Sequence, residues 1–168
     1  MVKKYNERLR FFRKNQAKTS GVALSLTYLP NSMGGDSETT PKALFEIAPL
    51  ISGTDKYDWG METKIIINLA QKEILDFICL AQKKVKQMNF FHTPQKANRP
   101  NESVAMNCSW NKKELATGET EYSLSMFFNR NKDKKLSITL SQSEVEGVKL
   151  AMEEIFKLML DWTNTLGE

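Results

Sequence analysis

Two stretches of the chain repeat one pattern of hydrophobic and polar positions, in which several short strands are followed by an amphipathic helix. The first stretch covers about residues 9–88 and the second about residues 90–164. Within the strands, apolar residues alternate with short polar ones, which is typical of strands that lay one face on a core. At 168 residues the chain fits a single domain with a sizeable core. The pattern therefore predicts one α+β domain over residues 1–168, built from two similar halves.

The predicted strands are separated by polar segments rich in proline or glycine. Those of the first half are Leu9–Lys14, Gly21–Leu29, Lys42–Ala48 and Met61–Leu69. Those of the second half are Phe90–His92, Val104–Asn111, Glu121–Arg130 and Lys135–Leu140. Pro30–Pro41 and Thr93–Glu102 contain the turn-forming residues expected of loops.

One helix is predicted at the end of each half. Asn68 is placed to cap the first, with Gln71 three residues on, and the helix is expected to fade near Lys86. Ser141 and Glu144 form a capping box that opens the second helix. Its apolar positions recur at intervals of three and four, and the ones predicted to form an oligomer interface are Val148, Met152, Ile155, Met159 and Trp162. The alternative is that the stripe covers the chain's own sheet.

The second face of the strands is unusually short and uncharged. It comprises Ala23, Ser25, Thr27, Ala105, Asn107, Ser109, Ser123, Ser125, Ser137 and Thr139. Short hydroxyl and amide side chains let a ligand approach the backbone closely, and Phe127, with Trp59 as a further candidate, offers a surface for base stacking. The alternative is a sheet face buried in a homo-oligomer.

Basic residues are expected around the rim of this face, where they can follow phosphates. They are Arg10, Arg13, Lys14, Lys18, Lys64, Lys112, Lys113, Arg130, Lys132, Lys134 and Lys135. The predicted nucleic-acid contacts are Lys18, Ser25, Thr27, Lys64, Asn68, Asn107, Ser109, Ser123, Ser125, Phe127, Asn129 and Arg130. The net charge of +4 and the pI near 9.0 fit such a ligand without requiring it.

Several kinds of chemistry are missing from the sequence. It contains no glycine-rich phosphate loop, no CxxC and no HxxxH motif, and its single histidine, His92, is expected to be a structural hydrogen-bonding group. Tyr57-Asp58-Trp59 is interpreted as a turn pinned by Asp58, with Trp59 packed at the sheet end. The sequence therefore predicts neither an enzyme, nor a metal site, nor a cofactor.

The location is also predicted from what the sequence lacks. No apolar run is long enough to span a membrane, and the polar N-terminus carries no secretory signal. Cys79 and Cys108 lie in apolar segments and are expected to be reduced thiols. We expect a cytoplasmic protein of a bacterium or a phage-infected cell.

Four segments resemble the Whirly single-stranded-DNA-binding proteins. They are VALSL at Val22–Leu26, FEIAP at Phe45–Pro49, KYDWGMETKIIINL at Lys56–Leu69 and FFHTP at Phe90–Pro94. The resemblance runs in order from about Thr19 to Trp162, and the second half matches by pattern more than by identity. It implies two tandem units, each a four-stranded antiparallel sheet plus a helix, and a homotetramer with the helices packed inward.

The resemblance also implies that single strands run along the sheets with little sequence preference. The plant family's Lys-Gly-Lys motif is missing, because Thr19-Ser20-Gly21-Val22 stands there and only Lys18 is nearby. This departure removes the basis for carrying over any assembly beyond the tetramer.

The expected function is a non-catalytic single-stranded DNA-binding protein that serves replication, recombination or repair. Relatives of the family include guide-RNA-binding proteins and coactivators, so RNA binding or strand annealing is an alternative. An oligomeric scaffold without a nucleic-acid ligand is a third.

Overall fold

The computed structural model of the protein describes residues 8–29, 42–93 and 102–165, with side chains as far as Leu160. The first sheet contains β1 (Leu9–Lys14), β2 (Gly21–Leu29), β3 (Lys42–Pro49) and β4 (Ile65–Leu69), and α1 (Gln71–Ala81) follows it. The second contains β5 (Gln87–His92), β6 (Val104–Glu114), β7 (Thr120–Arg130) and β8 (Lys134–Ser141), followed by α2 (Gln142–Thr165). In each sheet the strands pair antiparallel in chain order. The predicted fold class is confirmed.

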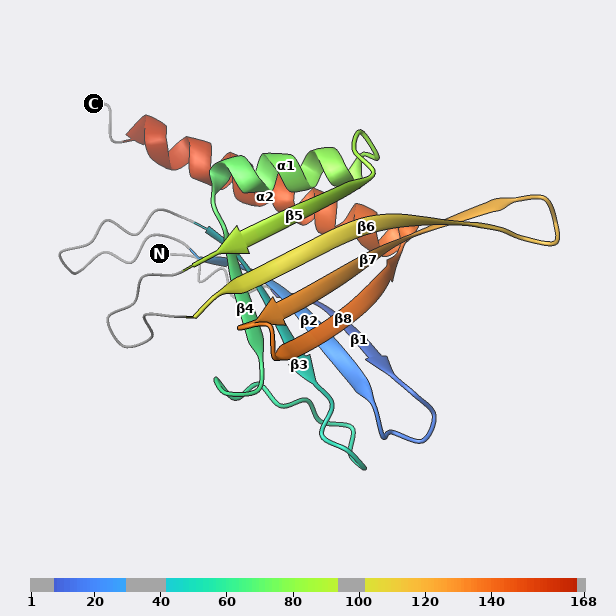
Figure 1. Ribbon diagram of the computed structural model, residues 1–168. Coiled ribbons are helices and arrows are strands. Elements are labelled where there is room, and N and C mark those ends of the chain that lie inside the picture. The colour runs from blue at the N-terminus through green and yellow to red at the C-terminus, as the bar shows by residue number, and fades with distance from the viewer. Residues whose placement is uncertain (1–7, 30–41, 94–101, 166–168) are drawn as a thin grey trace.

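One hydrophobic core joins the two halves. The inner faces of the sheets contribute Leu24, Phe45 and Met126, all fully buried, and α1 inserts Phe77 between them. The Phe77 ring lies 5.6 Å from that of Phe45 in the first sheet and 6.4 Å from that of Phe90 in the second. Figure 1 shows the two helices side by side along one side of the molecule, while the sheets cross each other. The opposite face of the second sheet is therefore left for other contacts.

The apolar stripe of α2 belongs to this core. Val148 and Met152 are fully buried, and Ile155 and Met159 are 6% and 4% exposed within a single chain. The structure corrects the prediction that these four residues form an oligomer interface, because they already pack on the chain's own sheets and on α1. The side chain of Trp162 lies outside the described residues. The periodicity of a helix shows which of its faces is apolar, but it does not show which part of the protein covers that face.

The start of α2 follows the prediction, and Arg13 ties it to the first sheet. The Ser141 N–H donates to the Glu144 carboxylate at 2.8 Å, and the Glu144 N–H donates back to the Ser141 hydroxyl at 3.4 Å. Arg13 of β1 pairs with Glu144 at 2.5 Å and also donates to the Thr139 carbonyl. Burial opposes ionisation of Glu144, but the bonds from Ser141 and Arg13 outweigh it and lower the pKa of Glu144.

The start of α1 differs from the prediction. Asn68 lies in β4, paired with Leu44, and does not cap the helix. The helix begins after Ala70, whose N–H donates to the Glu73 carboxylate at 3.0 Å. Glu73 therefore takes the part expected of Gln71, because it stands three residues after Ala70, where its side chain reaches back to the orphan N–H.

Other element boundaries also differ from the predicted ones. α1 ends at Ala81, since Lys83 adopts a left-handed conformation (φ 58°) that stops the helix before Lys86. Met61–Lys64 is a turn rather than the start of a strand, because the Thr63 and Lys64 N–H groups donate to the Gly60 carbonyl. β6 and β7 extend further than predicted, and Figure 1 shows their shared end projecting beyond the other strands.

Candidate nucleic-acid interface

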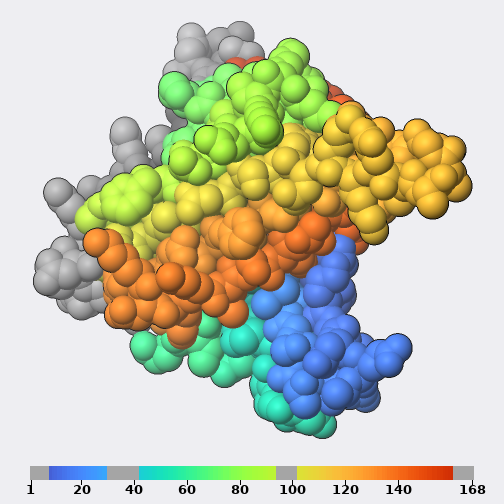
Figure 2. All heavy atoms as spheres, turned by 45° about the vertical axis from the view of Figure 1, so that its right-hand side comes forward, coloured from blue at the N-terminus to red at the C-terminus, as the bar shows by residue number. Residues whose placement is uncertain are grey.

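The outer face of the second sheet forms a broad surface of short polar side chains. Pairing across β5 to β8 brings them into rows on one side of the sheet. The predicted contacts on this face are Asn107, Ser109, Ser123, Ser125, Phe127 and Asn129, all exposed or half-buried. Figure 2 shows these strands, coloured from yellow-green to orange, lying side by side across the molecule. Neither of the described helices covers this face, which leaves it available to a long ligand.

Two aromatic rings stand on this face. Phe127 is 49% exposed while its neighbour Phe128 is fully buried, so the phase predicted for this strand is confirmed. Phe91 of β5 is 66% exposed, whereas Phe90 is buried in the core. Phe91 is not among the contacts predicted from the sequence, because the short segment Phe90–His92 leaves open which of its two rings faces outward. Exposed rings of this kind are the surfaces on which bases stack.

Some of the polar groups on this face already bond to one another. The Asn111 amide donates to the Ser125 hydroxyl at 2.7 Å, and the Ser125 and Thr139 hydroxyls lie 3.2 Å apart. In the described part of the chain, the Asn107 and Asn129 amides form no side-chain hydrogen bond. Those two amides are therefore the groups on this face best able to bond a base edge.

The outer face of the first sheet is less accessible than predicted. Ser25 and Thr27 are 1% and 8% exposed, and their hydroxyls are buried without a hydrogen-bond partner. In register, Ser25 lies between Arg10 on β1 and Glu46 on β3, whose longer side chains flank it. Asn68 is half-buried, with its side-chain oxygen also buried and unpartnered. The structure corrects the prediction that Ser25 and Thr27 are open contacts.

An aromatic cluster lies at the edge of this first sheet. The Phe12 ring is 52% exposed and lies 5.4 Å from that of Tyr57. The Arg10 guanidinium lies 5.7 Å from the centre of the Trp59 ring, within the range of a cation–π contact. Asp58 accepts the Gly60 N–H at 3.0 Å, so the predicted turn is pinned by Asp58. These rings offer a second surface for stacking.

Two of the predicted phosphate contacts are lysines that already have acidic partners. Lys18 pairs with Asp55 at 2.6 Å, and Lys14 binds the same carboxylate. Hydrogen bonds from Lys14 and then from Lys18 lower the pKa of Asp55 to about 2, so the carboxylate stays ionised at any ordinary pH. Lys64 pairs with Glu46 at 2.6 Å, and both side chains are mostly buried. Both predicted contacts therefore already neutralise a carboxylate, and Lys64 is mostly buried as well.

Arg130 is likewise occupied inside the protein. Its guanidinium donates to the carbonyls of Met61, Glu62 and Lys64 at 2.5–3.1 Å, and its side chain is 13% exposed. It also lies 3.7 Å from the Glu102 carboxylate. Arg130 fastens the end of β7 to the turn before β4, so its donors are engaged by protein carbonyls and Arg130 is replaced below as a candidate for phosphate contact.

Open cations also lie beside the second sheet, and Lys132 and Lys135 stand together at one end of it. Among the described residues, Lys132 and Lys135 form no ion pair and no side-chain hydrogen bond. Both are exposed and lie at or next to the β7–β8 turn. These two lysines replace Lys64 and Arg130 as the candidates for phosphate contact.

Within the described residues, no group of three or more histidine, cysteine or acidic side chains is gathered as a metal site would require. His92 lies 2.6 Å from the Glu73 carboxylate, in the structural role expected of it. None of the described helices is both long and apolar enough to cross a membrane.

Comparisons with known proteins agree with this geometry. Residues 17–151 match a family model described as the Whirly transcription factor. Among solved structures, WHY3 from Arabidopsis thaliana superposes with a TM-score of 0.64 and 17% identity, over 96% of this chain and 93% of that chain. The structure of the plant transcriptional regulator PBF-2 superposes with a TM-score of 0.59 and 16% identity, over 96% of this chain and 87% of that chain. The Trypanosoma brucei MRP1/MRP2 structure superposes with a TM-score of 0.52 and 8% identity, over 96% of this chain and 88% of that chain. No curated protein sequence matches the chain.

Proposed function

Because the chain belongs to the Whirly family, we propose that it is a non-catalytic protein that binds single-stranded DNA on the outer faces of its sheets. The observation that carries the proposal is the outer face of the second sheet, which presents Phe91 and Phe127 among short uncharged side chains. Lys132 and Lys135 stand at its rim and make no ion pair within the described chain. The surface thus combines stacking platforms with cations that can follow a backbone.

This arrangement favours unpaired bases and weak sequence preference. A duplex hides the faces of its bases in the stack, whereas a single strand can lay them on exposed rings. Every base has such a face, so stacking discriminates little between sequences. A protein of this kind would protect single strands during replication, recombination or repair.

We propose that the protein acts as a homotetramer. The buried stripe of α2 does not supply the contact surface, but Leu75 on α1 and Leu150 on α2 are 43% and 54% exposed. Full burial of an exposed leucine contributes roughly 1.5–3 kcal/mol, so covering the exposed half of each of these side chains contributes about 1 kcal/mol. Light scattering of the purified protein measures the mass of the assembly, and a monodisperse monomer would contradict the proposed tetramer.

The function is tested by comparing strands of one sequence. We expect a labelled 30-nucleotide single-stranded DNA to bind at least about tenfold more tightly than its duplex at the same salt concentration, because only unpaired bases reach the rings. Fluorescence anisotropy measures both affinities. Equal affinities would contradict the proposal, and tighter binding of the matching RNA would favour the RNA-binding alternative.

The open lysines should account for part of the salt dependence. For single strands, the logarithm of affinity falls with the logarithm of salt by about 0.7 per phosphate neutralised. Lys132→Ala and Lys135→Ala should each flatten that slope by about this amount. Lys18→Ala is the matched control and should change the slope less, because Asp55 already holds the Lys18 ammonium. A larger change for Lys18→Ala than for the other two would reverse the assignment.

A further inference from the structure

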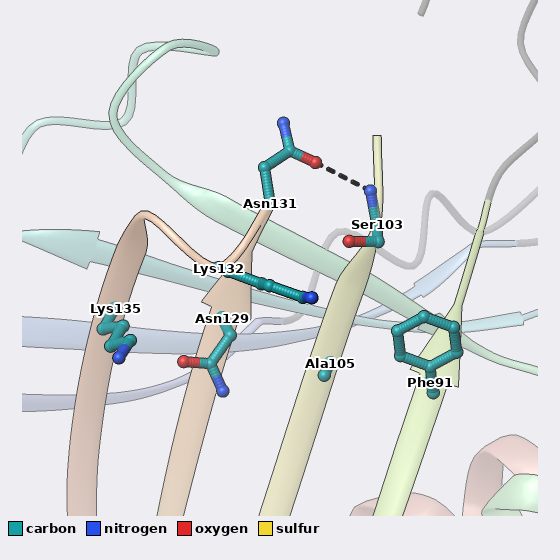
Figure 3. Close-up of a pocket in the computed structure, with 7 residues that line it drawn as sticks. All are labelled: Phe91, Ser103, Ala105, Asn129, Asn131, Lys132 and Lys135. Atoms are coloured by element: carbon teal, nitrogen blue, oxygen red, sulfur yellow. Dashed lines mark hydrogen bonds between the residues drawn. The ribbon is translucent and has the colours of Figure 1, made fainter. Parts of the chain in front are cut away.

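A pocket of about 380 Å³ opens at one end of the outer face of the second sheet. Figure 3 shows its walls, with Phe91 from β5 on one side and Asn129, Lys132 and Lys135 on the other. Ala105 of β6 stands between Phe91 and Asn129 in the register. Because its side chain is a single methyl group, the space between the ring and the amide stays open.

The dimensions of the pocket suit a flat ligand. Phe91 and Asn129 lie two strands apart in one row, which corresponds to about 10 Å. The Phe91 ring is 66% exposed, so one face is free to stack on a base. A nucleobase seated over Ala105 would bring its edge toward Asn129, whose amide both donates and accepts hydrogen bonds.

The turn that carries the cations is held in place. Asn131 accepts the Ser103 N–H on its side-chain oxygen at 2.8 Å and donates its own N–H to the Ser103 carbonyl at 2.9 Å. Asn131 and Lys132 both have left-handed backbones (φ 54° and 65°), as tight hairpin turns require. Figure 3 shows the Lys132 side chain extending from this turn toward Phe91. The backbone that carries Lys132 is therefore held at the edge of the pocket by these two hydrogen bonds.

We propose that this pocket holds one unpaired nucleotide of a bound single strand, with its base stacked on Phe91 and the phosphates on its two sides against Lys132 and Lys135. The inference rests on the proposed function, since it assigns a place on the outer face to one nucleotide of the strand. Both lysines make no ion pair in the described part of the chain, so their charge is available to an anion. Stacking and charge then act on different parts of the same nucleotide.

The test measures binding of oligothymidylate by Phe91→Ala. Affinity should fall roughly 5- to 150-fold, the range expected for the loss of one base–ring stack, while the salt slope stays unchanged because no charge is removed. Phe91→Trp should bind at least as tightly as the wild type. Val85→Ala is the matched control, because Val85 is an exposed apolar residue in the turn after α1, away from the pocket. Thermal unfolding should be similar for all four proteins.

A second measurement locates the base directly. A strand carrying one 5-iodouridine should form a photochemical adduct with the peptide that contains Phe91, identified by mass spectrometry. Thymidine monophosphate at millimolar concentration should not displace the strand. Displacement by low concentrations of the mononucleotide would instead make the pocket a site for free nucleotides and overturn the assignment to a strand.

The two proposals fail in distinguishable ways. A wild type that binds no single strand overturns the proposed function, and the pocket assignment with it. A wild type that binds normally, while Phe91→Ala binds equally well and the adduct maps elsewhere, overturns the pocket alone.

Discussion

Replacing Lys64 by methionine is expected to lower the free energy of unfolding by about 3–5 kcal/mol. The Lys64 ammonium lies 2.6 Å from the Glu46 carboxylate, and the two side chains are only 14% and 8% exposed. Methionine preserves much of the packing but leaves the Glu46 charge buried without its partner, which is the more damaging half of breaking such a pair. Urea denaturation followed by circular dichroism measures the change.

The double variant Glu46→Gln/Lys64→Met is the matched control. It removes both charges, so most of the lost stability should return even though the ion pair is gone. If Lys64→Met were as stable as the wild type and instead flattened the salt dependence of single-strand binding, Lys64 would be the phosphate contact that the sequence predicts.

Arg130→Ala is expected to lower the free energy of unfolding by about 2–4 kcal/mol. The substitution removes the donors to the carbonyls of Met61, Glu62 and Lys64, which hold the turn before β4 against the end of β7. Charged hydrogen bonds of this kind contribute about 1.5–3 kcal/mol each, and water can replace part of that loss at the partly exposed carbonyls. The midpoint of urea unfolding should fall for Arg130→Ala.

Lys135→Ala serves as the comparison for Arg130→Ala. It also removes one positive charge at the same end of the sheet, but Lys135 is exposed, so stability should stay within about 0.5 kcal/mol of the wild type. A reversed result, with a stable Arg130→Ala that binds single strands weakly, would return Arg130 to the interface.

The fold could be predicted from the sequence because the inner faces of the strands impose a period of two. β1 and β2 have the predicted bounds, and the long alternation around Phe127 and Phe128 fixes which ring is buried. Phe91 was missed because Phe90–His92 is too short a segment to fix the phase of a strand. The predicted strand begins too early at Met61, because the sequence pattern does not reveal the turn in which the Gly60 carbonyl accepts the Thr63 and Lys64 N–H groups.

The roles of the charged residues could not be predicted in the same way. Composition shows where lysine and arginine occur, but an ion pair depends on which carboxylates and carbonyls the fold brings close. Lys64 meets Glu46 from 18 residues away, and Arg130 meets the Glu62 carbonyl from 68 residues away. For the same reason the sequence does not decide whether the stripe of α2 forms an interface or the core, since its periodicity says nothing of the sheet that covers it.

The order of the strands has a consequence for the protein's solubility. Each four-stranded sheet ends in two strands with unpaired backbone groups, which invite pairing with the edge of another chain. The apolar edge strand β4 contacts β6 and β7, while β8 contacts β2 and β3 and β5 contacts α1. β1 has fewer neighbours among the described elements, and it carries Arg10, Arg13 and Lys14 within six residues. Long charged side chains on an edge strand hinder its pairing with another chain, and those of Arg13 and Lys14 are held there by carboxylates of the same chain, which protects the folded protein against edge-to-edge aggregation.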